Sequence, residues 1–299
     1  MIILYIGYYA SKKESGDQTS QGLLLAGRRM PAWIGIFTMT ATWVGGGYII
    51  GTSEAVYDSA RGLVWAQAPW GYALSLILGG LFFAKKIRSF GYTTFIDVFE
   101  HKYGKKTAAI LFIPALIGEV FWSAAILAAL GITFATIFEL DLETSILVSA
   151  SIAIGYTMMG GLWSVAYTDV VQLIFIIVGL GISIPFALDK IGGIEAALNI
   201  YDQQITNGFN LFPSLSAFSG TDPAWGNSIW VWLDFALLLI MGGIPWQVYF
   251  QRVLSSNSDK SAIRLSIFGG ICCALMAIPA IFIGVAGVGF DWSQSSLGV

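Results

Sequence analysis

Residues 38–52, TMTATWVGGGYIIGT, form an apolar stretch that is unusual for a membrane helix. Three consecutive glycines, Gly45, Gly46 and Gly47, follow Val44 immediately after Trp43. Glycine costs about 1 kcal/mol relative to alanine inside a helix, so three together favour an opened backbone. The stretch therefore predicts a broken helix beside an indole ring.

The composition is that of an integral membrane protein. The 299 residues are 56% hydrophobic and 11% charged, with a mean hydropathy of +0.75, whereas a soluble domain carries about 25% charged residues. The net charge of −3 gives no indication of a nucleic-acid partner. Cys272 and Cys273 are adjacent within an apolar run, which is typical of small helix-packing residues rather than a disulfide.

Apolar runs long enough to cross a bilayer, which needs about 20 residues, recur along the chain. They cover residues 31–57, 62–84, 107–138, 144–160, 162–188, 228–251 and 265–289. The run at 1–10 is too short to span and lacks the features of a signal peptide. We expect it to be the end of a longer helix, and we expect both ends of the chain to be incomplete.

Charges segregate between alternate loops. One side holds 13 of the 15 Lys and Arg residues: Lys12, Lys13, Arg28, Arg29, Lys85, Lys86, Arg88, Lys102, Lys105, Lys106, Arg252, Lys260 and Arg264. The positive-inside rule places that side in the cytoplasm. The opposite loops are acidic, with only Arg61 and Lys190 as cations.

A second broken helix is expected in the span 228–251. The stretch IMGGIPWQVYF places Gly242, Gly243 and Pro245 just before Trp246, and proline removes a backbone donor. Counted from the first broken span as number one, this is the sixth, so the starts of the two broken spans are five spans apart. An odd repeat implies inversion, which is typical of secondary transporters whose site lies between two discontinuous helices. The alternative is that the glycines serve close helix packing and that Pro245 makes an ordinary kink.

The predicted organisation has six parts. They are a partial leading transmembrane helix at 1–10, a cytoplasmic loop at 11–30, a first five-helix repeat at 31–188, an extracellular loop at 189–227, the first two helices of a second repeat at 228–289, and the extracellular start of a truncated remainder at 290–299.

Four aromatic residues lie within the spans expected to line the site: Trp43, Tyr72, Trp122 and Trp246. Tryptophans in membrane proteins usually lie at the membrane–water interface, but Trp43, Trp122 and Trp246 lie well inside their spans. Converging rings form a cage for a quaternary ammonium through cation–π attraction. The acidic residues within the spans, Glu54, Glu119, Asp169 and Asp234, lie near span ends, where we expect them to cap helices or contact water.

Several stretches carry a resemblance to a known family. FTMTATWVGGGY, LILGGLFFAKK, LFIPALIGE, SVAYTDVVQL and GGIPWQ followed by YFQRVLSS resemble the choline-transporting branch of the sodium/solute symporter family. The similarity runs along nearly the whole chain and is weakest in residues 1–27 and 189–227. It implies an all-α integral membrane fold, a leucine-transporter-type five-plus-five inverted repeat with an extra leading helix, whose second repeat is truncated here.

The resemblance also implies a function. It implies sodium-coupled, chloride-dependent choline uptake across the plasma membrane, including presynaptic terminals and vesicle membranes, to supply acetylcholine synthesis. By resemblance the four aromatics form the choline cage, and the backbone carbonyls of Ala41 and Val44 form half of a sodium site. The expected partners are choline, sodium, chloride and the lipid bilayer, with no other cofactor and with homo-oligomerisation left open.

Two further readings stay open. The chain could be a non-transporting fragment or short isoform, or a same-fold symporter for another organic cation such as betaine or carnitine. An enzyme is not expected, because the single histidine, His101, lies in a loop and no nucleophile–base pair or metal-ligand spacing is present.

Overall fold

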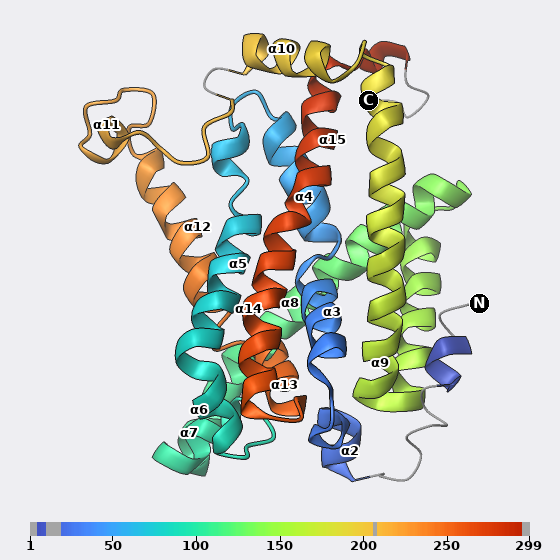
Figure 1. The fold of residues 1–299 in the computed structure, drawn as a ribbon, viewed down its shortest axis with the longest axis vertical. Coiled ribbons are helices and arrows are strands. Elements are labelled where there is room, and N and C mark those ends of the chain that lie inside the picture. Colours follow the sequence, from blue (N-terminus) through green and yellow to red (C-terminus); the bar gives the residue numbers. More distant parts are fainter. Residues whose placement is uncertain (1–4, 10–18, 206–207, 295–299) are drawn as a thin grey trace.

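A computed structural model describes residues 5–9, 19–205 and 208–294. These residues are helical apart from connecting segments, and an isolated bridge between Met30 and Ser256 is their only β pairing. Most helices run along the long axis of the molecule, while α10 lies across one end (Figure 1). Of the predicted leading helix at 1–10, residues 5–9 are helical and the others lie outside the described residues.

The predicted loop at 11–30 is partly helical. Its described portion contains α2, Ser20–Leu25, and the 3-10 turn η1, Ala26–Arg28. The Thr19 hydroxyl caps α2 by accepting a hydrogen bond from the Gly22 backbone. The sequence did not predict this short helix, because its apolar residues form a single run that is too short to show a helical repeat.

The first broken span consists of α3, Ala32–Trp43, and α4, Gly46–Tyr57, bent by 52°. Only Val44 and Gly45 leave helical geometry, with φ/ψ of −92°/64° and −93°/−173°. The prediction that Gly46 and Gly47 belong to the opened backbone is therefore wrong, since both begin α4. Two non-helical residues are sufficient to redirect the chain.

The next span is continuous but irregular. It comprises α5, Ala68–Leu78, the π-helical turn η3, Gly79–Phe83, and α6, Ala84–Ser89. It begins later than the predicted residue 62, because Leu63–Trp65 form a separate 3-10 turn, η2, and Pro69 suits the first turn of a helix. The short helix α7, Ile96–Tyr103, follows.

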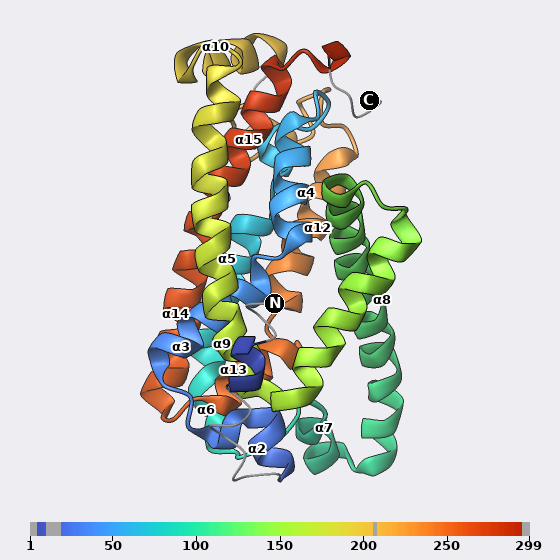
Figure 2. The ribbon, with the colours of Figure 1, turned by 90° about the vertical axis from the view of Figure 1, so that its right-hand side faces the viewer.

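Helices α8, Lys105–Phe138, and α9, Leu142–Asp189, complete the predicted first repeat. Within α9, Gly161 departs from helical geometry and separates the two predicted spans 144–160 and 162–188. The first half of α9 packs on α8, and together they lean away from the other helices (Figure 2).

The second broken span runs in the opposite direction. After α10, Ile194–Gln204, and α11, Leu215–Phe218, it comprises α12, Ser228–Gly242, and α13, Gln247–Ser255. The break lies at residues 243–246, so Gly242 is helical, contrary to the prediction. Figure 1 shows α3 and α4 ascending while α12 and α13 descend, which is the expected inversion.

The last spans are α14, Asp259–Leu275, and α15, Ala277–Gly289, followed by the 3-10 turn η4, Trp292–Gln294. Within the part of the chain that the structure describes, four helical segments are long and apolar enough to cross a membrane: Lys105–Phe138, Gly161–Asp189, Ser228–Ser255 and Asp259–Gly289. The bent pair α3–α4 passes the same test as one span.

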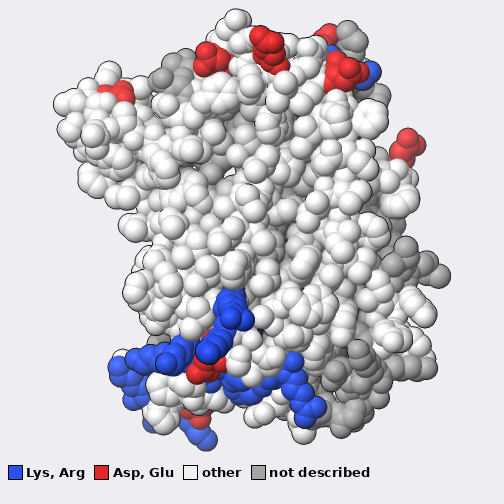
Figure 3. All heavy atoms as spheres, viewed as in Figure 1, with Lys and Arg blue, Asp and Glu red and all other residues white. Residues whose placement is uncertain are grey.

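Positively and negatively charged residues gather at opposite ends of the molecule. In Figure 3 lysine and arginine gather at the end that holds α2, α6 and α7, and acidic residues dominate the opposite end near α10. The wide band between them is almost free of charge in this view. The molecule is therefore a multi-pass membrane protein, and its basic end is expected to face the cytoplasm.

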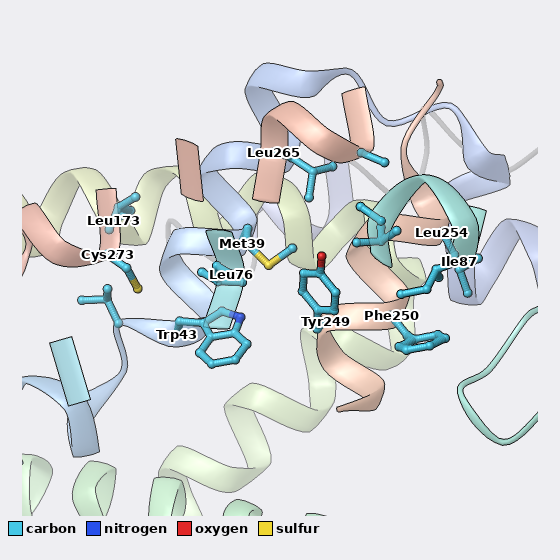
Figure 4. Close-up of a cluster of buried hydrophobic side chains, with 14 of the residues drawn as sticks. Met39, Trp43, Leu76, Ile87, Leu173, Tyr249, Phe250, Leu254, Leu265 and Cys273 are labelled. Carbon is cyan, nitrogen blue, oxygen red and sulfur yellow. The ribbon is translucent and has the colours of Figure 1, made fainter. Parts of the chain in front are cut away.

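The largest buried cluster surrounds the first break. Met39, Trp43, Val44, Leu76 and Tyr249 belong to it, and Figure 4 shows side chains from several helices meeting there. Trp43 is only 1% exposed. The break is therefore held within packed protein, as an irregular backbone at membrane depth requires.

Candidate functional site

The two helix breaks face each other across the core. Trp43 is the last residue of α3, and Trp246 is the residue immediately before α13, in extended geometry after Pro245. Their ring centroids are 5.2 Å apart with an interplanar angle of 84°. A Cβ atom on Gly243 would collide with the Trp43 ring and the Ser75 hydroxyl, so the second break approaches the first as closely as glycine allows.

Tyr72 and Trp122 extend this pair into a cluster of four rings. Tyr72, from α5, lies 4.9 Å from Trp43 at 76°, and Trp122, from α8, lies 5.0 Å from Trp246 at 82°. We call Trp43, Tyr72, Trp122 and Trp246 the ring cluster. Successive rings are nearly perpendicular, so the cluster presents ring faces in several directions. The structure thus brings together all four aromatics singled out in the sequence.

Tyr48 supports the cluster and was not singled out in the sequence. Its ring stacks on Tyr72 with centroids 6.2 Å apart, and its hydroxyl donates to the Cys273 carbonyl over 2.5 Å. This bond connects α4 to α14, far along the chain. Its position one turn after Val44 is the only signal that could have indicated this role.

Glu119 also contacts the cluster. The Trp246 indole nitrogen donates a hydrogen bond to Glu119 Oε1 over 2.7 Å. The sequence suggested a cap or a water contact for this residue, but it lies in the middle of α8 and accepts a bond from a predicted cage residue.

Two cavities lie beside the helix breaks, one toward each end of the molecule. The outer one, about 540 Å³, lies between α4, α5 and α12. Its lining includes Gly47, Gly51, Arg61, Gln67 and Phe235. The inner one, about 550 Å³, lies between α8 and the second break and is lined by Phe95, Pro114, Glu119, Pro245 and Trp246, among others.

The first break leaves backbone oxygens without helical partners. Val44 donates to the Thr40 carbonyl, and the next helical donors, Tyr48 and Ile49, both reach Gly45. Among the described residues, no backbone N–H donates to the carbonyl of Ala41 or of Val44. These are the two oxygens expected for sodium, and hard cations prefer such ligands. Over the same residues, no cluster of His, Cys, Asp or Glu could hold a metal ion.

A buried polar network lies below the cluster. Asp169, within α9, accepts a hydrogen bond from the Thr38 hydroxyl and lies 3.9 Å from the Arg252 guanidinium. Arg252 also donates to Thr42 and Gln251. The expectation that Asp169 caps a helix or meets water is wrong, because α9 continues through it and its side chain is only 13% exposed.

The model of the Sodium:solute symporter family matches residues 23–291, which is most of the chain. The chain belongs to the sodium:solute symporter family. This family comprises transporters rather than enzymes, in agreement with the reading of the sequence.

Curated members of the family include close relatives. The chain is 50% identical over 303 residues to "High affinity choline transporter 1" of Homo sapiens, covering 100% of this chain and 50% of that protein. It is 47% identical to "High-affinity choline transporter 1" of Drosophila melanogaster, covering 99% and 45%. A "Sodium/glucose cotransporter" of Vibrio parahaemolyticus is 30% identical, with coverage of 95% and 53%. The chain thus spans about half the length of the curated relatives it matches.

The fold also has a solved counterpart. A Na⁺-coupled sialic acid symporter in a substrate-bound, outward-open state matches with a TM-score of 0.81 and 20% identity, covering 100% of this chain and 61% of that one. The likeness confirms the predicted leucine-transporter-type inverted-repeat fold. The boundaries of the six predicted parts remain predictions.

Proposed function

We propose that the protein containing this chain carries choline across a membrane together with sodium. The observation that supports this best is the ring cluster, in which four aromatic residues meet where two broken helices face each other. A quaternary ammonium cannot donate hydrogen bonds, so cation–π attraction, about 0.5–2 kcal/mol, is the natural way to hold it. The names of relatives about 50% identical to the chain support the same substrate.

Sodium is the proposed coupling ion. Its ligands on this chain are the carbonyls of Ala41 and Val44, beside the ring at Trp43. Sodium bound there stabilises the opened backbone, and that backbone fixes the direction of the Trp43 side chain. Ion binding is thereby coupled to the order of the choline site.

Transport then follows an alternating-access cycle. Choline enters from the outer cavity, is occluded at the ring cluster and leaves through the inner cavity once the two breaks rearrange. Each positive charge entering a negative interior gains about 2.3 kcal/mol per 100 mV, so uptake is driven by voltage as well as by sodium.

Three further properties are proposed from the resemblance. They are chloride dependence, residence in the plasma membrane with presynaptic terminals and vesicle membranes in neurons, and supply of choline for acetylcholine synthesis. Uptake measured with chloride replaced by gluconate tests the first. Imaging of the tagged protein in cholinergic neurons tests the second, and acetylcholine content after depletion of the protein tests the third.

A zwitterionic substrate such as betaine or carnitine is disfavoured by Glu119. Its carboxylate bonds to a cage ring, where it would repel the carboxylate of a zwitterion. Competition of each compound with radiolabelled choline distinguishes these substrates, since only choline-like cations should compete well.

The first experiment measures radiolabelled choline uptake by cells expressing the full-length protein, with sodium or with a sodium substitute. We expect uptake to need sodium and to fall at least about tenfold in Trp43→Ala and Trp246→Ala, which each lose a ring of the cage. Trp33→Ala is the matched control, because Trp33 lies on α3 with 56% exposure.

Surface biotinylation normalises each variant to the protein at the cell surface. The proposal is contradicted if uptake is the same with and without sodium. It is also contradicted if both cage variants take up as much choline as Trp33→Ala.

A further inference from the structure

We propose that Glu119 is a positioning residue of the choline site that orients Trp246 and supplies the negative charge behind its ring. This inference rests on the proposed function, because it concerns how the ring cluster recognises a cation. It adds an acidic residue to a site otherwise made of aromatic rings.

One turn of α8 delivers both a ring and a carboxylate to the same place. Glu119 and Trp122 are three residues apart, so they share one face of the helix. Trp122 packs edge-to-face on Trp246, with centroids 5.0 Å apart, while Glu119 accepts the hydrogen bond from the Trp246 indole nitrogen. The Trp246 ring is thus held by α8 at two points.

Trp246 needs such an anchor because its own backbone lies in a break. It follows Pro245 in extended geometry, between the end of α12 and the start of α13. The side chain is only partly buried, and the inner cavity opens beside it. Without a fixed indole direction, this ring could turn toward the cavity instead of toward Trp43.

The charge of Glu119 has no cationic partner in the described part of the chain. The salt bridges found there join Arg61 to Asp58 and Arg252 to Asp169, and neither involves Glu119. A carboxylate at membrane depth is costly unless it is paired or hydrated, and such residues line substrate pathways. Glu119 lines the inner cavity, and a cation on the ring cluster would give it a partner.

The hydrogen bond also strengthens the ring itself. An indole N–H that donates to a carboxylate makes a charge-assisted bond, which polarises the donor. Electron density shifts into the ring, so its face attracts a cation more strongly. Glu119 therefore favours a cationic substrate through Trp246 as well as through its own field.

The experiment compares choline with its neutral analogue 3,3-dimethyl-1-butanol, in which carbon replaces the charged nitrogen. In the full-length protein, Glu119→Gln keeps an oxygen that can accept the indole bond but removes the charge. We expect the KM for choline to rise about tenfold, with inhibition by the neutral analogue unchanged. Glu119→Leu removes the bond too and should also lower the maximal rate. Glu54→Gln, an exposed carboxylate on α4, is the control and should match wild type.

Trp246→Phe provides a second measurement that does not depend on changing Glu119. It keeps a ring but removes the N–H, so we expect a higher KM for choline, and we expect a further Glu119→Gln to add less than it does alone. A Glu119→Gln protein with wild-type KM and wild-type preference for choline overturns the proposal. If Trp43→Ala and Trp246→Ala still abolish uptake in that assay, the proposed choline cage stands. Only the proposed role of Glu119 is then rejected.

Discussion

At the scale of single residues, the contact between Gly243 and Trp43 brings the two breaks together. The space where a Gly243 side chain would lie is filled by the Trp43 ring and the Ser75 hydroxyl. The neighbouring Gly242 has much more room, since the closest atom to a Cβ there is a Leu238 carbon at 3.9 Å. The two adjacent glycines therefore have different roles, one in close packing and one without a steric requirement.

Gly243→Ala is expected to push the Trp43 ring away from Trp246. Overpacking of this kind costs about 1–3 kcal/mol, so choline uptake should fall several-fold and thermal stability should drop. Gly242→Ala is the matched control and should leave both within a small factor of wild type. The two variants are compared by choline uptake per molecule at the cell surface and by melting temperature in detergent. Equal uptake and equal melting temperatures would contradict the close packing of Gly243.

At the scale of elements, α9 changes direction at Gly161. This residue has φ of 55° and ψ of −149°, a conformation essentially reserved for glycine. A Cβ there would also lie 2.6 Å from the Leu23 carbonyl of α2. The corner between the two halves of α9 therefore depends on backbone geometry and on a close approach by another helix.

Gly161→Ala is expected to lower the free energy of unfolding by about 1–3 kcal/mol, because alanine is strained at this φ and clashes with α2. Gly155→Ala, six residues earlier in α9 with nothing within 4 Å of the added carbon, should be neutral or slightly stabilising. Thermal unfolding of both variants in the same detergent measures the difference. A stable Gly161→Ala protein would show that the corner tolerates a side chain.

The start of α7 is expected to depend on pH. Burial alone would raise the pKa of Asp97, but hydrogen bonds from Thr94 and Thr93 together hold that pKa below its ordinary value of 3.8. A lowered pKa in the folded state means that the carboxylate stabilises this turn at neutral pH and that the stabilisation is lost as the pH falls through that pKa.

Hydrogen exchange at Thr93 and Thr94, corrected for intrinsic rates, should therefore accelerate when the pH is lowered to about 3. Asp97→Asn should exchange faster already at neutral pH and should show little further change on acidification. An unchanged exchange rate in Asp97→Asn would mean that the carboxylate does not hold the turn.

At the scale of the whole molecule, the two broken spans are joined at the basic end. Met30, just before α3, donates to the Ser255 carbonyl over 3.0 Å and accepts from the Asn257 backbone over 2.9 Å. Arg252 on α13 reaches Thr42 on α3 and Asp169 on α9. These contacts connect three spans that are far apart in sequence, on the side where the inner cavity opens.

Removing one member of the buried Arg252–Asp169 pair is expected to destabilise the protein by about 3–5 kcal/mol, since the other charge is left unpaired. Arg252→Gln and Asp169→Asn should each lower the melting temperature and the amount at the cell surface. The double variant should be less unstable than the sum of the two single variants, because no lone charge remains. Strict additivity would show that the pair is not coupled.

The membrane spans and the two helix breaks of this protein were predictable from the sequence alone. Hydropathy, charge placement and the positions of glycine, proline and tryptophan predicted the spans, the two breaks and their inversion, because these features depend on local composition and on the bilayer. Three rings of the cluster were recognisable because tryptophan deep within a span is unusual, and Tyr72 because it lies in a span expected to line the site.

Only the tertiary structure decided the exact residues of each break and the partners of the acidic residues Glu119 and Asp169. Gly46, Gly47 and Gly242 are helical, because the neighbouring residues already supply the change of direction. Glu119 meets Trp246 across 127 residues, and Asp169 meets Arg252 across 83. Such pairings depend on how helices pack against one another, and a one-dimensional pattern carries no distance between segments that are remote along the chain.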